Sequence, residues 1–192
     1  MKNIQIFDNI ISLEKQEEIK NLLYGNNFPW YYINDVTLSN KNPYQQRPAL
    51  NHLYVDDERI NSDKFSKIKI IFDEGSKRLN KKFKPIKVRS FMQFPLNKNI
   101  IGENYKDTPH LDMEKPHTVF LYYVNDSDGE TIIYDYNSKN INDVPLFENI
   151  KIIKKVKPKQ GRLIVFDGFT WHSSSQPRNN VRTVINFDLC SI

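Results

Sequence analysis

The stretch Thr118-Val-Phe-Leu-Tyr-Tyr-Val124 consists almost entirely of β-branched and aromatic residues, which favour β-strands. A turn signal, Asp126-Ser-Asp-Gly129, follows it and leads into Thr131-Ile-Ile-Tyr-Asp-Tyr136, a second segment of the same character. The composition of the two segments and the turn between them predict two closely spaced strands.

Further strands are predicted on both sides of this pair. Segments of β-forming residues joined by short connections bring the total to at least six, the others being residues 88–94, 150–156, 162–166 and 182–188. A short additional strand is expected at residues 4–7.

Two helices are predicted before most of these strands. Ser12 can cap a helix that runs to about Leu23, and Glu14 in the first turn favours its N-terminus. A second helix is expected over residues 63–79, where apolar residues recur on one helical face. Helices followed by closely spaced strands are typical of a β-sandwich or jelly roll with helices packed outside it.

The charge pattern is basic but does not by itself indicate a polyanion partner. The formal net charge is +5, and much of it lies in two runs, residues 81–89 and 151–159. Such runs can attract nucleic acid. Apolar residues alternate with the charges in both runs, however, which favours strands with one solvated face.

The cysteine count and the hydropathy predict the compartment. Cys190 is the only cysteine, so no intrachain disulfide forms, and a reducing cytoplasm is the expected location. No stretch approaches the roughly 18 apolar residues of a membrane helix, so no membrane partner is expected.

A dense cluster of histidines and carboxylates lies in residues 108–117. His110 and Asp112 alternate, so in extended chain their side chains point the same way and can reach one ion. His117 would need a special loop to join them, and a turn would aim Glu114 elsewhere. We therefore expect His110 and Asp112 to be the metal-binding pair.

A third metal ligand is predicted downstream. In Gln160-Gly-Arg-Leu-Ile-Val-Phe-Asp-Gly-Phe-Thr-Trp-His172, a glycine-led apolar strand carries His172 just past its end, ten residues before Arg182. Two histidines and one carboxylate on one face of an Fe(II) ion leave other positions open for substrate chemistry.

This order of residues resembles the Fe(II)- and 2-oxoglutarate-dependent dioxygenases, in particular the prolyl 4-hydroxylase-like branch. The resemblance covers residues 88–189 and includes the segments Phe120-Leu-Tyr-Tyr-Val-Asn125, Asp128-Gly-Glu-Thr-Ile-Ile133 and Lys157-Pro-Lys-Gln-Gly-Arg-Leu-Ile-Val-Phe166. It implies a double-stranded β-helix, which is a cupin-like jelly roll. One domain is then expected over residues 1–192, with 1–84 as helical support and substrate-side loops and 85–192 as the catalytic core.

The resemblance also implies roles for individual residues. His110, Asp112 and His172 match the iron ligands and are thus the expected catalytic residues. Arg182 matches the residue that pairs with the far carboxylate of 2-oxoglutarate, with Arg178 as a nearby rival. Tyr123 matches a tyrosine that donates to the same carboxylate, although it could equally be a core aromatic.

The chain departs from the family pattern at two positions. The family often has a tyrosine three residues before the first histidine, where this chain has Asp107, with Tyr105 two residues further back. Phe94 stands where some members have another tyrosine that contacts the co-substrate. Tyr105 and Trp171 are candidate substrate contacts, although Trp171 could equally fill the core.

The expected activity follows from the resemblance. With Fe(II), 2-oxoglutarate and O2, the enzyme would hydroxylate a C–H bond and release succinate and CO2. The substrate would be a protein or peptide side chain such as proline, or an amino-acid-like small molecule, contacted by loops in residues 28–47 and 97–108. Nucleic acid is disfavoured, because residues 182–192 lack the second arginine of the alkylated-base branch. The alternative is a non-catalytic jelly-roll module that binds a polyanion or an oligosaccharide.

Overall fold

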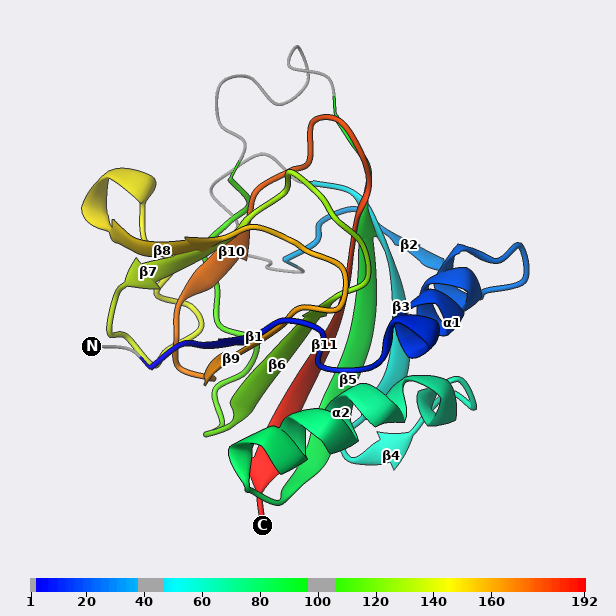
Figure 1. Ribbon diagram of the computed structural model, residues 1–192. Coiled ribbons are helices and arrows are strands. Elements are labelled where there is room, and N and C mark those ends of the chain that lie inside the picture. Colours follow the sequence, from blue (N-terminus) through cyan, green and yellow to red (C-terminus); the bar gives the residue numbers. More distant parts are fainter. Residues whose placement is uncertain (1–2, 38–46, 97–105) are drawn as a thin grey trace.

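The computed structural model describes residues 3–37, 47–96 and 106–192, and these form two antiparallel sheets with two α-helices (Figure 1). The large sheet has the order β1 (Gln5–Phe7), β9 (Leu163–Asp167), β6 (Thr118–Tyr123), β11 (Arg182–Ser191), β5 (Phe83–Gln93), β3 (Ala49–Asp56) and β2 (Tyr31–Ile33), with β4 (Arg59–Ile60) on β3. The small sheet has the order β10 (His172–Ser174), β7 (Thr131–Asp135) and β8 (Lys151–Val156).

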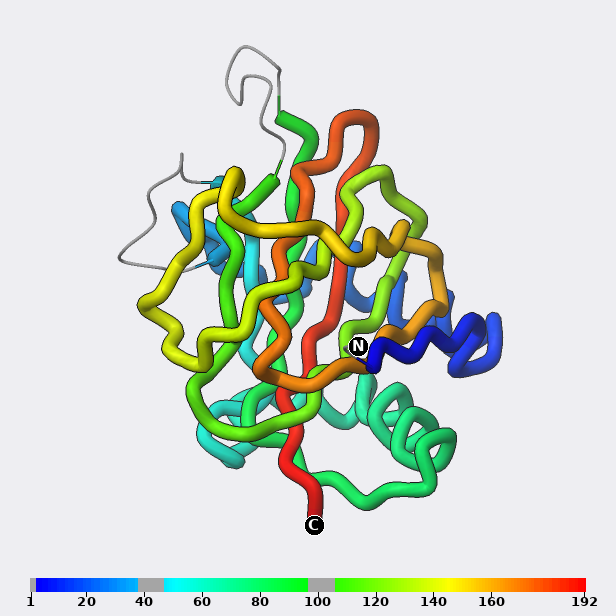
Figure 2. The backbone as a smooth tube through the Cα atoms, turned by 90° about the vertical axis from the view of Figure 1, so that its left-hand side faces the viewer, coloured from blue at the N-terminus to red at the C-terminus, as the bar shows by residue number. Residues whose placement is uncertain are grey.

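The two sheets face each other across an apolar layer, with the small sheet lying over the large one (Figure 2). Val119 and Leu121 of β6 pack in this layer with Ile133 of β7 and Val156 of β8. Because the sandwich encloses one face of the large sheet, alternate residues of its central strands are shielded from water. The predicted mostly-β jelly roll is confirmed.

Both helices cover the outer face of the large sheet. α1 (Leu13–Tyr24) begins after Ser12, whose hydroxyl accepts a hydrogen bond from the Lys15 amide, and α2 (Phe65–Leu79) ends at Asn80. Gly75 lets α2 approach β6 closely, since a Cβ atom there would lie 2.5 Å from the Phe120 ring. Both helices agree with the prediction to within two residues.

Burial on both faces explains the continuous apolar run at residues 118–124. The even-numbered residues Phe120 and Tyr122 pack against the helices, whereas Val119, Leu121 and Tyr123 point between the sheets. A strand covered on both faces has no reason to alternate apolar and polar residues.

The N-terminal part of the chain contributes more to the sheet than the sequence indicates. Besides the expected strand at residues 4–7, it supplies β2, β3 and β4, and β3 pairs with β5 through residues such as His52 opposite Ser90. Polar residues interrupt the β-forming pattern of β3, so its sequence does not predict a strand. The strand forms because its neighbours β2 and β5 supply its hydrogen-bond partners. No helix within the described ranges is long and apolar enough to cross a membrane.

Candidate metal centre and co-substrate pocket

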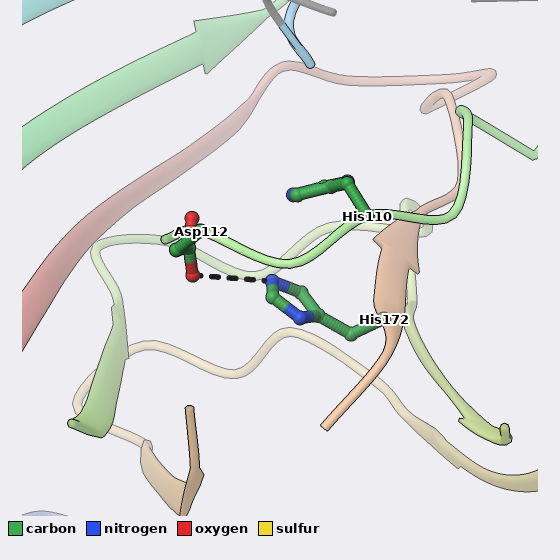
Figure 3. Close-up of side chains that lie close together, drawn as sticks. All are labelled: His110, Asp112 and His172. Carbon is green, nitrogen blue, oxygen red and sulfur yellow. Dashed lines mark ion pairs between the residues drawn. The ribbon is translucent and has the colours of Figure 1, made fainter. Parts of the chain in front are cut away.

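Backbone pairing brings the three predicted metal ligands together. The His110 amide donates to the His172 carbonyl at 2.9 Å, and the His172 amide donates back to the His110 carbonyl at 3.1 Å. Asp112 follows two residues after His110, and the three side chains point toward the same space (Figure 3). Their ligand atoms all lie within 4.8 Å of one another.

Hydrogen bonds to the backbone leave the same nitrogen of both histidines available for a metal. His110 Nδ1 lies 2.9 Å from the Thr108 carbonyl oxygen, and His172 Nδ1 lies 3.0 Å from the Thr170 carbonyl oxygen. A carbonyl only accepts, so each Nδ1 carries the proton and each Nε2 keeps its lone pair. Burial lowers the pKa of His172 to about 4, which keeps this ligand neutral.

Asp112 is oriented by an arginine that the sequence interpretation did not identify as part of the site. Arg89 Nη2 donates to Asp112 Oδ1 at 2.9 Å and to Asp188 Oδ2 at 2.9 Å. Asp112 Oδ2 is buried without a hydrogen-bond partner among the described residues and lies 3.5 Å from His172 Nε2. One carboxylate oxygen is therefore held by Arg89 and the other faces the two imidazoles.

The charges around Asp112 favour its ionised form. Burial alone would raise the pKa of Asp112, but His172 in its protonated form and the Arg89 guanidinium, which stays charged, lower it. Burial and the neighbouring Asp112 charge raise the pKa of Asp188 to about 7. Two imidazoles and one ionised carboxylate are the donor set that suits Fe(II) with open positions. The residues present therefore fit the predicted iron.

Arg89 is the exception in the first basic run, which is interpreted from the sequence as a strand with one solvated face. Lys84 is exposed, but Arg89 on the same strand is buried and faces the enclosed side of the sandwich. In β11, Asp188 shares the face of Arg182 by the two-residue period. That alternation was visible in the sequence, but it does not show whether the shared face meets water or the interior.

Replacing Arg89 by methionine is expected to destabilise the metal-free protein by about 3–5 kcal/mol, because two buried carboxylates lose their shared counter-ion. The double variant Arg89→Met/Asp188→Leu should recover part of this loss, since one of the two buried carboxylates is then gone while Asp112 still lacks a counter-ion. Urea unfolding of the metal-free variants measures both values. The exposed Lys84–Glu58 pair supplies the control, and Lys84→Met should change the free energy of unfolding little. Additive losses in the double variant would contradict the shared-counter-ion role.

A second group of metal-capable atoms, from Asp112, His117 and Asp188, shares Asp112 with the first. His117 Nε2 is 3.8 Å from Asp188 Oδ1, and its Nδ1 lies 2.7 Å from the Lys115 carbonyl oxygen. Arg89 already places a cation between the two carboxylates of this group. The triad of His110, Asp112 and His172 is therefore the better candidate centre.

Arg182 lies in the same cavity as the triad and is buried, with 4 % of its surface exposed. Its side chain donates to three neutral acceptors: Nε to the Gly129 carbonyl at 2.9 Å, Nη1 to Gln93 Oε1 at 3.0 Å, and Nη2 to Thr131 Oγ1 at 2.9 Å. Among the described residues no carboxylate forms an ion pair with it. A guanidinium has five N–H donors, so one N–H on each terminal nitrogen remains for a ligand.

The cavity that joins these groups has a volume of about 240 Å³. His110, Asp112, His172 and Arg182 line it together with apolar side chains such as Phe91 and Val184. A buried guanidinium that forms no ion pair with the described residues, in one cavity with three converging metal ligands, fits an anion that also reaches the metal.

Tyr123 does not line the cavity, although the family resemblance implied that its hydroxyl contacts the co-substrate carboxylate. Its hydroxyl donates to Thr131 Oγ1 at 2.7 Å, and Thr131, not Tyr123, lines the cavity. The Tyr123 ring lies 5.9 Å from the Arg182 guanidinium carbon. The structure therefore places Tyr123 behind Thr131, as a support for the residue that contacts Arg182.

Of the two candidate substrate residues, the structure describes Trp171, which does not line the cavity. Trp171 is fully buried among Leu111, Ile132 and Tyr134, and its indole N–H donates to the Ser138 carbonyl at 2.7 Å. This placement favours the core role that the sequence left open for Trp171. Tyr105 lies outside the described residues.

The described parts of the predicted substrate-side loops add little to the cavity wall. In residues 28–47 only Val36 and Thr37 line the cavity, and most of the loop in residues 97–108 lies outside the described residues. Phe94 is half-exposed, whereas the preceding residue, Gln93, points inward to Arg182. Arg178, the rival of Arg182, is exposed in the connection before β11.

Comparison with known proteins supports this fold. No family model and no curated protein sequence matches the chain. The structure is similar to an oxidoreductase of the 2OG-Fe(II) oxygenase family from Burkholderia pseudomallei, with a TM-score of 0.67, 10 % identity, and coverage of 97 % of this chain and 84 % of the other.

Two further solved structures are similar. A prolyl hydroxylase from Trichoplax adhaerens, in complex with a hypoxia inducible factor peptide, has a TM-score of 0.62, 14 % identity and coverage of 98 % and 84 %. HygX from Streptomyces hygroscopicus, with nickel, 2-oxoglutarate and hygromycin B bound, has a TM-score of 0.59, 11 % identity and coverage of 98 % and 82 %. With two facing antiparallel sheets and a converging His-Asp-His group, this chain has the fold of the 2OG-Fe(II) oxygenases.

Proposed function

We propose that the protein is an Fe(II)- and 2-oxoglutarate-dependent oxygenase. It hydroxylates a C–H bond of a protein side chain, such as a prolyl ring, or of an amino-acid-like small molecule, and releases succinate and CO2. The observation that carries this proposal is one cavity that contains three converging metal-ligand atoms and Arg182, a buried cation that forms no ion pair with the described residues.

Each residue has a distinct part in this activity. His110, Asp112 and His172 hold the iron, which when bound supplies the activation of O2 for C–H oxidation. Arg182 binds the far carboxylate of 2-oxoglutarate with its two remaining N–H groups. The Nδ1 bonds of the histidines and the Arg89 bond to Asp112 keep the ligand atoms aimed inward, so little reorganisation is needed when the metal binds.

The comparisons support two substrate classes for this site. The Trichoplax adhaerens enzyme is in complex with a peptide, and HygX has hygromycin B bound. In this chain Val36, Thr37, Lys87 and Ile141 line the cavity beyond the metal ligands, a mixture of apolar and polar groups. Such a wall suits a side chain or small molecule with both an aliphatic part and a polar backbone-like part.

The proposal is tested by succinate formation. Metal-free protein is loaded with Fe(II) without oxygen, then given 2-oxoglutarate, air and panels of proline-containing peptides or free amino acids. Mass spectrometry should find succinate only with both iron and 2-oxoglutarate, and one added oxygen atom in a turned-over substrate. If the protein holds iron but neither binds nor consumes 2-oxoglutarate, the proposed activity is wrong and the alternative of a non-catalytic binding module is favoured.

A further inference from the structure

We infer that Gln93 and Asp107 are positioning residues for the co-substrate arginine. Asp107 fixes the side-chain amide of Gln93 so that its oxygen faces Arg182, and this bond holds the guanidinium for the far carboxylate of 2-oxoglutarate. The inference rests on the proposed function for its ligand. Its structural part rests on contacts among the described residues.

The sheet register places Gln93 beside Arg182. Gln93 is the last residue of β5 and pairs with Arg182, the first residue of β11. Its side chain is fully buried, and its Oε1 accepts from Arg182 Nη1 at 3.0 Å. Because the pairing fixes both Cα positions, only the orientation of the Gln93 amide remains to be decided.

Asp107 is the nearer of two acceptors that set this orientation, the other being Gln176 Oε1 at 3.4 Å from Gln93 Nε2. Gln93 Nε2 donates to Asp107 Oδ2 at 2.8 Å. Turning the amide over would place its oxygen against this carboxylate and its NH2 group against the guanidinium, and both contacts would be repulsive. Only one of the two amide orientations is therefore compatible with its neighbours.

Asp107 is itself held as an acceptor. Ser174 Oγ also donates to Asp107 Oδ2, and Arg47 Nε lies 3.8 Å from Oδ1. Burial raises the pKa of Asp107 above its ordinary value, and the hydrogen bonds from Ser174 and Gln93 and the nearby Arg182 and Arg47 guanidinium groups offset part of this rise. Each of the contacts on Asp107 presents a donor to it.

Gln93 is a neutral residue that lies between the Asp107 carboxylate and the Arg182 guanidinium. Gln93 transmits the orienting effect of Asp107 but keeps the carboxylate from pairing with Arg182. Glutamate at position 93 would give Arg182 an internal counter-ion, which would compete with a carboxylate ligand. The arrangement orients the arginine without neutralising it.

This arrangement also gives a physical account of the two departures from the family pattern. Asp107 occupies the position where a tyrosine is often found, and Phe94 occupies the other tyrosine position but turns outward. The inward-facing polar group at this end of β5 is Gln93 instead. The polar groups of this region are thus the Gln93 amide and the Asp107 carboxylate, whereas the family pattern has one or two tyrosine hydroxyl groups.

The test measures ligand binding directly, by calorimetry on Zn(II)-loaded protein without oxygen. The two ligands are 2-oxoglutarate and oxalate, which also chelates a metal but has no far carboxylate. Gln93→Met has nearly the same length as the native residue and lacks the acceptor, so its dissociation constant for 2-oxoglutarate should rise on the order of tenfold. Its affinity for oxalate should be unchanged.

Asp107→Leu should weaken 2-oxoglutarate binding by a similar factor, and Asp107→Asn should restore most of the affinity, because its amide oxygen can still accept from Gln93. The double variant Gln93→Met/Asp107→Leu should bind no more weakly than the single variants, because Asp107 acts through Gln93. Gln16→Met is the matched control. It removes a buried glutamine with two hydrogen bonds in α1, far from the cavity, and should leave both affinities unchanged.

The outcomes separate this inference from the proposed function. If wild-type protein does not bind 2-oxoglutarate, or Arg182→Ala does not weaken its binding, the proposed function fails. If Arg182→Ala weakens binding but Gln93→Met does not, only the positioning role fails. Equal losses for 2-oxoglutarate and oxalate in Gln93→Met would indicate general damage to the site and would also overturn the role. Gln93→Met decides the question even where Asp107→Leu does not fold.

Discussion

Replacing His110, Asp112 or His172 by alanine is expected to abolish succinate formation and to weaken Fe(II) binding greatly. Each change removes one of three ligands whose free atoms converge within 4.8 Å, and two ligands cannot hold the ion in the required geometry. Iron content after gel filtration and succinate measured by mass spectrometry give the two readouts. Both should fall together in each of the three variants.

Two other histidines supply the comparison for this prediction. His52 is buried and hydrogen-bonded to the Pro29 carbonyl and to Ser62, away from the cavity, so His52→Ala should retain iron. His117→Ala should also retain iron, although His117 belongs to the second metal-capable group. Loss of iron in His117→Ala, with His110→Ala unaffected, would move the metal to the group of Asp112, His117 and Asp188.

Replacing Arg182 by alanine should raise the 2-oxoglutarate concentration needed for half-maximal activity by about two orders of magnitude or more. A buried carboxylate that loses its guanidinium partner costs about 3–5 kcal/mol, and each 1.4 kcal/mol is about a tenfold change in affinity. Iron content should hold, because Arg182 is bonded to Gly129, Gln93 and Thr131 and not to the metal ligands. Kinetics at varied 2-oxoglutarate, with iron measured in parallel, check both parts.

Two variants define what the arginine contributes. Arg182→Lys should recover only part of the affinity, because an ammonium cannot make the paired contact of a guanidinium. Arg178→Ala is the control, since Arg178 is exposed in the preceding connection, and its effect should be small. If Arg178→Ala gives the defect and Arg182→Ala does not, the co-substrate contact has been assigned to the wrong arginine.

Much of the fold could be predicted because local patterns carry it. Residues 118–124 and 131–136 form strands almost where their β-branched and aromatic composition places them, and Ser12 caps a helix as its position indicates. The His-x-Asp spacing and the distant His172 identified the candidate ligands, since alternate residues of extended chain share a side. Strand β3 escaped prediction because its hydrogen bonds come from neighbours in the sheet.

The surroundings of the ligands could not be predicted in the same way. Arg89 belongs to a run interpreted as a half-solvated strand, Gln93 and Asp188 have no role predicted from the sequence, and Asp107 stands only as a departure from the family pattern. Each became part of the site only when β5 and β11 were paired and the sandwich closed over them. Tyr123, in contrast, lies behind Thr131 and donates to its hydroxyl, while Thr131 lines the cavity. No sequence pattern indicates which of the two residues reaches the cavity.

By itself, the sequence determined both helices and most of the strands of residues 83–191, which side chains share a face of a strand, and which three residues suit a metal. The tertiary structure alone decided what each face meets: water for Lys84, the enclosed cavity for Arg89 on the same strand. The physical reason is that a two-residue period is a local property of extended backbone, whereas burial and charge pairing depend on segments far apart in the chain. Arg182 and Asp107, 75 residues apart in the chain, are joined by hydrogen bonds through Gln93 in the folded protein.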